Sequence, residues 1–272
     1  MLAHSALTFQ RHSALLAGAL FAVCSSASFA TVISVPNFSF ESQPAPPVTD
    51  PIPVTSKVDS WQRQDQPVFW DAISQGTPWS GTSGLFQSDY SYLNEEGHQA
   101  MYVLNIPGAG AFQDFNSTDW QNAAPTHAFN ATFTVGNAYQ LTLGLFGKNM
   151  DSSSSLTLSL YYRDGSNNKV TVGSTTIQYD AQVFVVQPNQ FPNMLQDYTV
   201  NIPVVQATDA WAGKNIGIDI VANVPLQNAN GSAYWDMDNV RLSSVPEPGS
   251  IGLLTFGAAG FLFGRGRARR QA

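Results

Sequence analysis

The chain has almost no cysteine. Its single cysteine, Cys24, lies among the first thirty residues, so a mature chain that begins after residue 30 contains none. Such a chain forms no disulfide bonds, even in a compartment that permits them. Its stability must therefore come from an ordinary apolar core, and the roughly 215 residues from 31 to 245 are enough to build one.

Basic residues are also scarce. Residues 31–245 contain 7 basic and 18 acidic residues, which is a net charge of −11. This charge disfavours nucleic acid and anionic lipid headgroups as partners, because both are polyanions. It suits a soluble extracellular domain, a domain that binds cations, or one that faces neutral sugars. A charge that serves solubility alone is an equally open interpretation.

The residues that carry most hydrolytic and metal-assisted catalysis are few. After residue 30 the only histidines are His98 and His127, and the chain has neither an HExxH pair nor a GxSxG turn. Glu95 and Glu96 are adjacent, and adjacent side chains on a strand point to opposite faces. This pair is typical of a solvated loop before Gly97. The sequence therefore predicts no catalytic activity.

Residues 1–30 have the features of a secretory signal peptide. Arg11 precedes the apolar run from Ala14 to Cys24, and small side chains follow up to Ala30. The run is too short to span a bilayer. We expect signal peptidase to cleave after Ala30, so that the ectodomain occupies residues 31–243.

Apolar and polar residues alternate through many short stretches of the chain. The longest are at residues 139–147 and 156–162, and others are at 100–104, 129–133 and 216–220. A period of two is typical of antiparallel strands with one face in the core. No stretch before the tail shows the apolar stripe of a helix. The pattern predicts an all-β fold, a single antiparallel β-sandwich of the jelly-roll type.

The two ends of this domain carry short motifs. Residues 37–41 read N-x-x-F-E and residues 238–242 read D-N-V-x-L. With the motifs between them, they make residues 31–242 resemble the galactose-binding-like jelly rolls of carbohydrate-binding modules. In that family the first-strand glutamate and the last-strand aspartate often hold a structural Ca²⁺, which implies Glu41 and Asp238 here. Calcium needs several further oxygen ligands, and two solvent-facing acids at strand ends are the alternative.

The same resemblance implies stacking of sugar rings on exposed aromatic side chains. Trp79 and Trp120 lie in loop-like sequence, so we expect them to be exposed and take them as the candidate ligand-binding residues. Trp61 and Trp235 are expected to pack inside, because a large aromatic side chain is more often part of a core.

The tail, residues 244–272, has three parts in a fixed order. The motif Val245-Pro246-Glu247-Pro248 is followed by an apolar stretch at residues 249–264 and by an arginine-rich end at residues 265–272. The arginines of that end are Arg265, Arg267, Arg269 and Arg270. This order resembles the PEP-CTERM sorting signal of Gram-negative bacteria. The resemblance implies a protein held transiently in the inner membrane, processed by an exosortase, and delivered to the cell surface or the exopolysaccharide matrix.

Simple physics agrees with that interpretation of the tail. Sixteen helical residues span about 24 Å, which is less than the roughly 30 Å of a hydrocarbon core, so the stretch is a marginal transmembrane helix. The arginines keep the C-terminus in the cytoplasm, with the ectodomain in the periplasm. The sequence thus predicts an exported, non-catalytic surface or matrix protein with polysaccharide as a candidate ligand. A structural or adhesive protein without a sugar site and a glycan-active enzyme are the alternatives.

Overall fold

The computed structural model describes residues 29–44, 57–71, 76, 78–88, 92–117, 129–184 and 193–247. Most of the expected signal peptide, the apolar stretch of the tail and its arginines lie outside the described residues. Within the described part of the chain, no helix has the length and apolar character needed to cross a bilayer.

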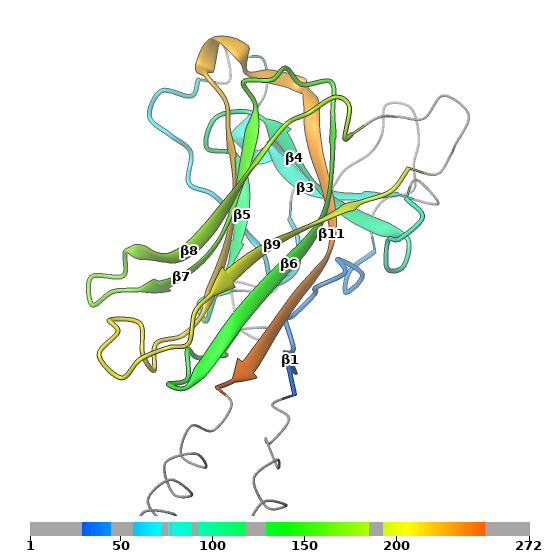
Figure 1. Ribbon diagram of the computed structural model, residues 1–272. Helices are drawn as coiled ribbons and strands as arrows, with labels where there is room; N and C mark the ends of the chain where they lie inside the picture. The colour runs from blue at the N-terminus through cyan, green and yellow to red at the C-terminus, as the bar shows by residue number, and fades with distance from the viewer. Residues whose placement is uncertain are drawn as a thin grey trace, which may run out of the picture. The chain divides into compact units, whose positions relative to one another are not determined.

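The alternating stretches form two antiparallel sheets (Figure 1). The first sheet has the order β3-β4-β11-β6-β9, with β1 beside β11. Its strands are β1 (Thr31–Ile33), β3 (Ser83–Gln87), β4 (Gln99–Asn105), β6 (Asn137–Lys148), β9 (Gln196–Ile202) and β11 (Asn230–Pro246). The second sheet has the order β2-β5-β10-β7-β8. Its strands are β2 (Gln62–Arg63), β5 (Gly110–Gln113), β7 (Ser155–Arg163), β8 (Lys169–Gln178) and β10 (Gly217–Asn223).

Apart from two short 3₁₀ turns, η1 (Trp79–Gly81) and η2 (Leu226–Asn228), the described residues contain no helix. The prediction of an all-β fold is therefore confirmed. One expected strand is wrong, because residues 129–133 form only an isolated bridge between Thr132 and Asn215. Phe129 and Phe133 are nevertheless buried, so the alternation there reflects burial without regular sheet pairing.

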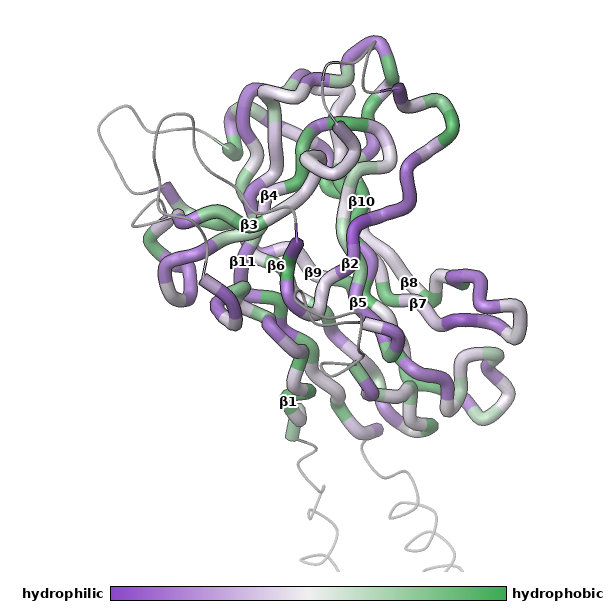
Figure 2. The backbone as a smooth tube through the Cα atoms, turned by 180° about the vertical axis from the view of Figure 1, so that it is seen from behind, coloured by the Kyte–Doolittle hydropathy of each residue, from purple (hydrophilic) through white to green (hydrophobic). Residues whose placement is uncertain are grey.

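One core lies between the sheets. The inward-facing leucines of β6 and β7 and the isoleucines of β10 are fully buried in it; they are Leu141, Leu143, Leu145, Leu156, Leu158, Leu160, Ile218 and Ile220. Burying each such side chain contributes about 1.5–3 kcal/mol. Figure 2 shows hydrophobic and hydrophilic residues following one another along the tube, as half-buried strands require. Trp61 and Trp235 are in this core, as expected.

Strand β11 connects the parts of the first sheet. Its first half pairs with β4, and residues 242–244 pair with β1. Between the two halves Asn239 has φ = 60°, a left-handed conformation that asparagine tolerates better than most residues. Its side-chain amide donates a 3.0 Å hydrogen bond to the carbonyl of Asn94. The long strand therefore changes course at Asn239 and presents different neighbours on each side of it.

The pairing of β1 joins the two ends of the domain. Thr31 lies opposite Ser244, and Ile33 lies opposite Leu242. The N-x-x-F-E motif does not lie on this first strand, because residues 36–40 form turns and Phe40 has φ = 59°. Glu41 thus follows a tight turn, where the resemblance implied a strand.

Candidate functional site

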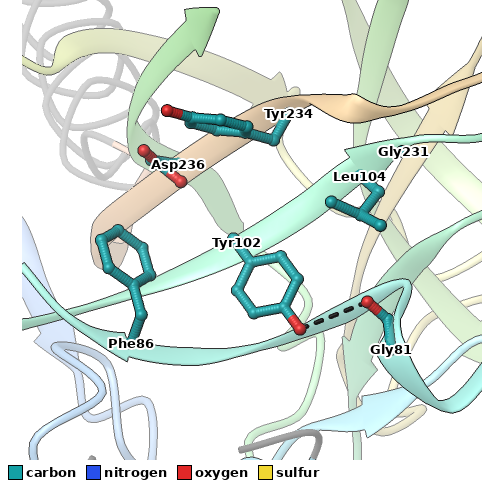
Figure 3. Close-up of a pocket in the computed structure, with 7 residues that line it drawn as sticks. All are labelled: Gly81, Phe86, Tyr102, Leu104, Gly231, Tyr234 and Asp236. Carbon is teal, nitrogen blue, oxygen red and sulfur yellow. Dashed lines mark hydrogen bonds between the residues drawn. The ribbon is translucent and has the colours of Figure 1, made fainter. Parts of the chain in front are cut away.

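A pocket of about 350 Å³ opens on the face of the first sheet that points away from the core. Strands β3, β4 and β11 supply most of its lining, and Figure 3 shows these side chains. The lining residues are Gly81, Phe86, Tyr102, Leu104, Gly231, Tyr234 and Asp236.

The register of the three strands brings these residues together. Tyr102 of β4 is directly opposite Asp236 of β11, and Leu104 is opposite Tyr234. On its other side Tyr102 is opposite Gly84 of β3. Because directly paired residues share a face, the two tyrosines and the aspartate all project to the outer side. The residues between them, Val103 and Trp235, point to the opposite side and fill the core.

Three aromatic rings form the apolar part of the pocket. The rings of Phe86 and Tyr102 are 6.4 Å apart between centroids and inclined at 60°. The Tyr102 hydroxyl donates a 3.2 Å hydrogen bond to the carbonyl of Gly81, which fixes the ring. Burial raises the pKa of Tyr102 to about 12, and it likewise raises the pKa of Tyr234 to about 12. Both side chains are therefore neutral hydroxyls at physiological pH.

Of the described lining residues, Asp236 alone carries a carboxyl group. It is only 4% exposed, and the hydroxyl of Tyr92 donates a hydrogen bond to its Oδ2. Burial raises the pKa of Asp236 to about 7, although the Tyr92 hydrogen bond and Lys148 act in the opposite direction. The Tyr92 ring is itself held by Phe146, at 5.5 Å between centroids. The carboxyl group is thus rigidly placed beside the aromatic rings.

The structure brings Glu41 and Asp238 to the same short turn, residues 95–99. Oε1 of Glu41 accepts hydrogen bonds from the backbone N–H of His98 (2.7 Å) and of Gln99 (2.6 Å). Oδ2 of Asp238 accepts one from the backbone N–H of Glu96 (2.6 Å). Residues far apart in the sequence therefore place two carboxyl groups around one loop.

The surroundings of Asp238 fit a hard cation. The side chain is fully buried, and its Oδ1 has no hydrogen-bond donor among the described residues. Burial raises the pKa of Asp238 to about 7, and the nearby carboxylates of Glu95 and Glu41 act in the same direction. A buried carboxylate with like charges nearby is stabilised by a cation. Backbone carbonyls would have to complete the set, because the described residues contain no group of three ligating side chains suited to a metal.

The exposure expected for Trp79 is wrong. Its side chain is only 8% exposed, its indole N–H donates a 2.7 Å hydrogen bond to the carbonyl of Gln64, and its ring lies 6.0 Å from that of Trp70. The η1 turn folds the indole inward, which the loop-like sequence does not reveal. Trp120 lies outside the described residues.

Sequence reasoning missed the pocket residues on β4 and β11. The motif Tyr234-Trp235-Asp236 contains the relevant signal, since its first and third residues share a face of the strand. The alternation of residues 100–104 likewise places Tyr102 and Leu104 on one face. Only the pairing of β4 with β11 shows that these two faces form one surface.

The chain carries a PEP-CTERM protein-sorting motif, which a family model matches at residues 244–270. Strand β11 ends at Pro246, and Val245, Pro246 and Glu247 are exposed. Pro248, the last residue of the motif, lies outside the described residues.

Several solved structures resemble the chain at low sequence identity. A cyclase from Fischerella sp. TAU is 19% identical, with a TM-score of 0.51 over 80% of this chain and 99% of that chain. The CBM22-1 xylan-binding domain of Paenibacillus barcinonensis Xyn10C is 7% identical, with a TM-score of 0.39 over 82% and 99%. The K1 adhesin domain of Lys-gingipain from Porphyromonas gingivalis W83 is 12% identical, with a TM-score of 0.36 over 79% and 96%.

No curated protein matches the sequence significantly. The similarity to the cyclase shows a shared fold, and a fold does not determine a function. Function therefore has to be argued from the residues of the pocket.

Proposed function

We propose that this is an exported protein of the cell surface or its matrix that binds carbohydrate without catalysis through the pocket on β3, β4 and β11. Export and sorting by an exosortase are supported by the motif at residues 244–270. In this proposal the tail serves only as a transient anchor in the inner membrane, and the jelly-roll ectodomain is the part that acts at the destination.

One observation carries the binding proposal: three aromatic rings and one carboxyl group line a single pocket. Small-molecule sites are typically apolar and aromatic, with a few polar groups that fix orientation. The apolar face of a sugar ring packs on the rings of Phe86, Tyr102 and Tyr234, and its hydroxyls hydrogen-bond with Asp236 and the tyrosine hydroxyls. The combination suits a sugar better than a purely apolar ligand.

The pocket also favours binding over glycoside hydrolysis. Glycosidases generally place two carboxyl groups on either side of the scissile bond, about 5–9.5 Å apart. Among the described residues that line the pocket, Asp236 is the only one with a carboxyl group. Glu95 and Glu96 belong to the turn beside Asp238, where the backbone N–H of Glu96 is bonded to that aspartate.

A glycan array probed with the purified protein tests the binding proposal. Tyr234→Ala and Phe86→Ala should each weaken binding about tenfold or more, which corresponds to about 1.4 kcal/mol. Tyr162→Ala is a matched control, because Tyr162 is a half-buried aromatic on β7 of the other sheet. Unchanged affinity in both pocket variants would overturn the proposed site. Binding to no glycan would favour a structural or adhesive protein instead.

We further propose that Glu41 and Asp238 hold a structural Ca²⁺. Binding to the folded state alone raises the melting temperature, so EDTA should lower it and excess calcium should restore it. Asp238→Asn should abolish this response. Asp180→Asn should retain it, because Asp180 is an exposed turn residue whose Oδ1 accepts a hydrogen bond from the backbone N–H of Gln182. Differential scanning calorimetry provides the measurement. A melting temperature that ignores both EDTA and calcium would contradict the proposal.

A further inference from the structure

The two ends of the pocket differ in charge. At one end β11 presents the Asp236 carboxyl group. At the other end the Tyr102 hydroxyl is bonded to the Gly81 carbonyl, and Arg63 of β2 is close enough to Tyr102 to influence its pKa. Figure 3 shows the Tyr102 ring between Asp236 and Gly81, with Tyr234 beside Asp236. A ligand that fits this arrangement carries positive charge on one side only.

Within the part of the chain that the structure describes, the Asp236 carboxyl group has no ion-pair partner. Tyr92 donates a neutral hydrogen bond to it. Among the described residues, no lysine or arginine forms an ion pair with Asp236, and Lys148 at the end of β6 affects it only at longer range. A carboxylate that is taken out of water gains most from a cation placed against it. The pocket therefore has room for a positive group at this end.

The aromatic rings favour the same kind of ligand. The face of an aromatic ring carries negative potential, and an ammonium group within about 6 Å of it is attracted, most strongly where water is excluded. Tyr234 is next to Asp236 on the same face of β11, and Tyr102 is directly opposite Asp236. Two aromatic side chains and a carboxyl group thus lie beside one another on the same face of the sheet.

We infer that the pocket binds an amino sugar of a polysaccharide, with the sugar ammonium against Asp236 and the ring against Phe86, Tyr102 and Tyr234. This inference rests on the proposed carbohydrate-binding function. The net charge of −11 on residues 31–245 supports it, because a polyanionic surface raises the local concentration of a cationic chain. A neutral or N-acetylated sugar would fill the same space and leave the carboxylate without a cation.

Isothermal titration calorimetry with three tetrasaccharides, made of glucosamine, N-acetylglucosamine and xylose, tests the inference near neutral pH. We expect the glucosamine tetrasaccharide to bind at least about tenfold more tightly than the N-acetylated one. Asp236→Asn should remove this preference, because the amide still accepts the Tyr92 hydrogen bond but carries no charge. Asp180→Asn removes the same charge from an exposed turn and should keep the preference.

The outcomes separate the two levels of the proposal. Equal affinity for the three ligands, or tighter binding of xylose or N-acetylglucosamine, would overturn the amino-sugar inference and leave carbohydrate binding in place. An equal loss of preference in Asp236→Asn and Asp180→Asn would also overturn it, since general electrostatic attraction would then suffice. Choline, a small cation without a sugar ring, serves as a fourth ligand. Binding of choline with no binding of any tetrasaccharide would overturn both the amino-sugar inference and the carbohydrate-binding proposal. Because the ligands are first compared on the unaltered protein, the inference is tested even if a variant does not fold.

Discussion

At the scale of single residues, the side chains around β11 are arranged for charge rather than for packing alone. Asp236 and Asp238 are on the same strand, both are buried, and burial raises the pKa of each to about 7. Asp236 accepts a hydrogen bond from the Tyr92 hydroxyl, and Asp238 accepts one from the backbone N–H of Glu96. Burial disfavours the charged form of both carboxyl groups, so the loss of either charge has a predictable effect on stability.

The raised pKa of Asp236 predicts a pH dependence of stability. The folded value, about 7, is above the unfolded value of about 3.9, so the folded state binds the proton more tightly. The contribution of Asp236 to the free energy of unfolding is therefore fully present below about pH 4. It is lost as the pH rises to about 7, and the loss is on the order of several kcal/mol. In urea titrations with EDTA, the free energy of unfolding of the Asp236→Asn variant should therefore rise relative to that of the unaltered protein across this pH interval. A constant difference between the two would contradict the assignment.

Gly97 offers a second test at this scale. Its φ is +91°, and an added Cβ would lie 2.4 Å from the Glu41 side chain. Gly136 has a similar φ of +88°, but an added Cβ there would meet nothing within 4 Å. Gly136→Ala should cost about 1–2 kcal/mol from backbone strain, and Gly97→Ala about 1–3 kcal/mol more from overpacking. Denaturant unfolding measures both, and equal losses would show that the Glu41 side chain moves aside without cost.

At the scale of elements, the second sheet is held on its outer face by a partly buried network of charges. Nε of Arg163 on β7 donates to Oδ2 of Asp114 at 2.7 Å, and the Tyr161 hydroxyl donates to the same oxygen at 2.6 Å. Nearby, Nζ of Lys169 on β8 donates to Asp219 of β10 at 2.7 Å and lies 3.6 Å from the centre of the Phe112 ring. The network thus links β5, β7, β8 and β10.

This network predicts unequal costs for two arginine–aspartate pairs. Asp114→Ala should destabilise the protein by about 3–5 kcal/mol, because it leaves Arg163 and the Tyr161 hydroxyl buried without their acceptor. Asp197→Ala removes the partner of Arg241, and those side chains are 51% and 47% exposed. Its cost should be less than about 1 kcal/mol. Free energies of unfolding from urea titrations make the comparison, and similar costs would contradict the burial argument.

The strands could be predicted from the sequence better than the site could. Alternation at residues 139–147 and 156–162 identifies β6 (Asn137–Lys148) and β7 (Ser155–Arg163) closely, because a half-buried strand is a local pattern. The burial of Trp79 depends on contacts with Gln64 and Trp70, which no local pattern reveals. The pocket depends on the pairing of Tyr102 with Asp236, which is a non-local property of the fold.

At the scale of the whole molecule, the part of the chain from Ala30 to Val245 forms one compact unit. The residues that line the pocket are different from those of the sorting motif, whose first residues are exposed at the end of β11. Substitutions in the pocket should therefore leave the sorting motif intact. Binding and delivery can be studied as separate properties of the protein.

The pairing of Thr31 with Ser244 means that the two ends of this unit are neighbours in space. Because its first and last strands are adjacent, the domain should tolerate circular permutation. Joining the two ends with a short glycine–serine linker and opening the exposed turn between Ala207 and Thr208 should give the same sandwich. Circular dichroism and an unchanged ligand affinity would show this, and loss of cooperative unfolding would refute it. In such a permutant the sorting tail would follow the turn at Ala207 instead of β11, and the pocket would be unchanged.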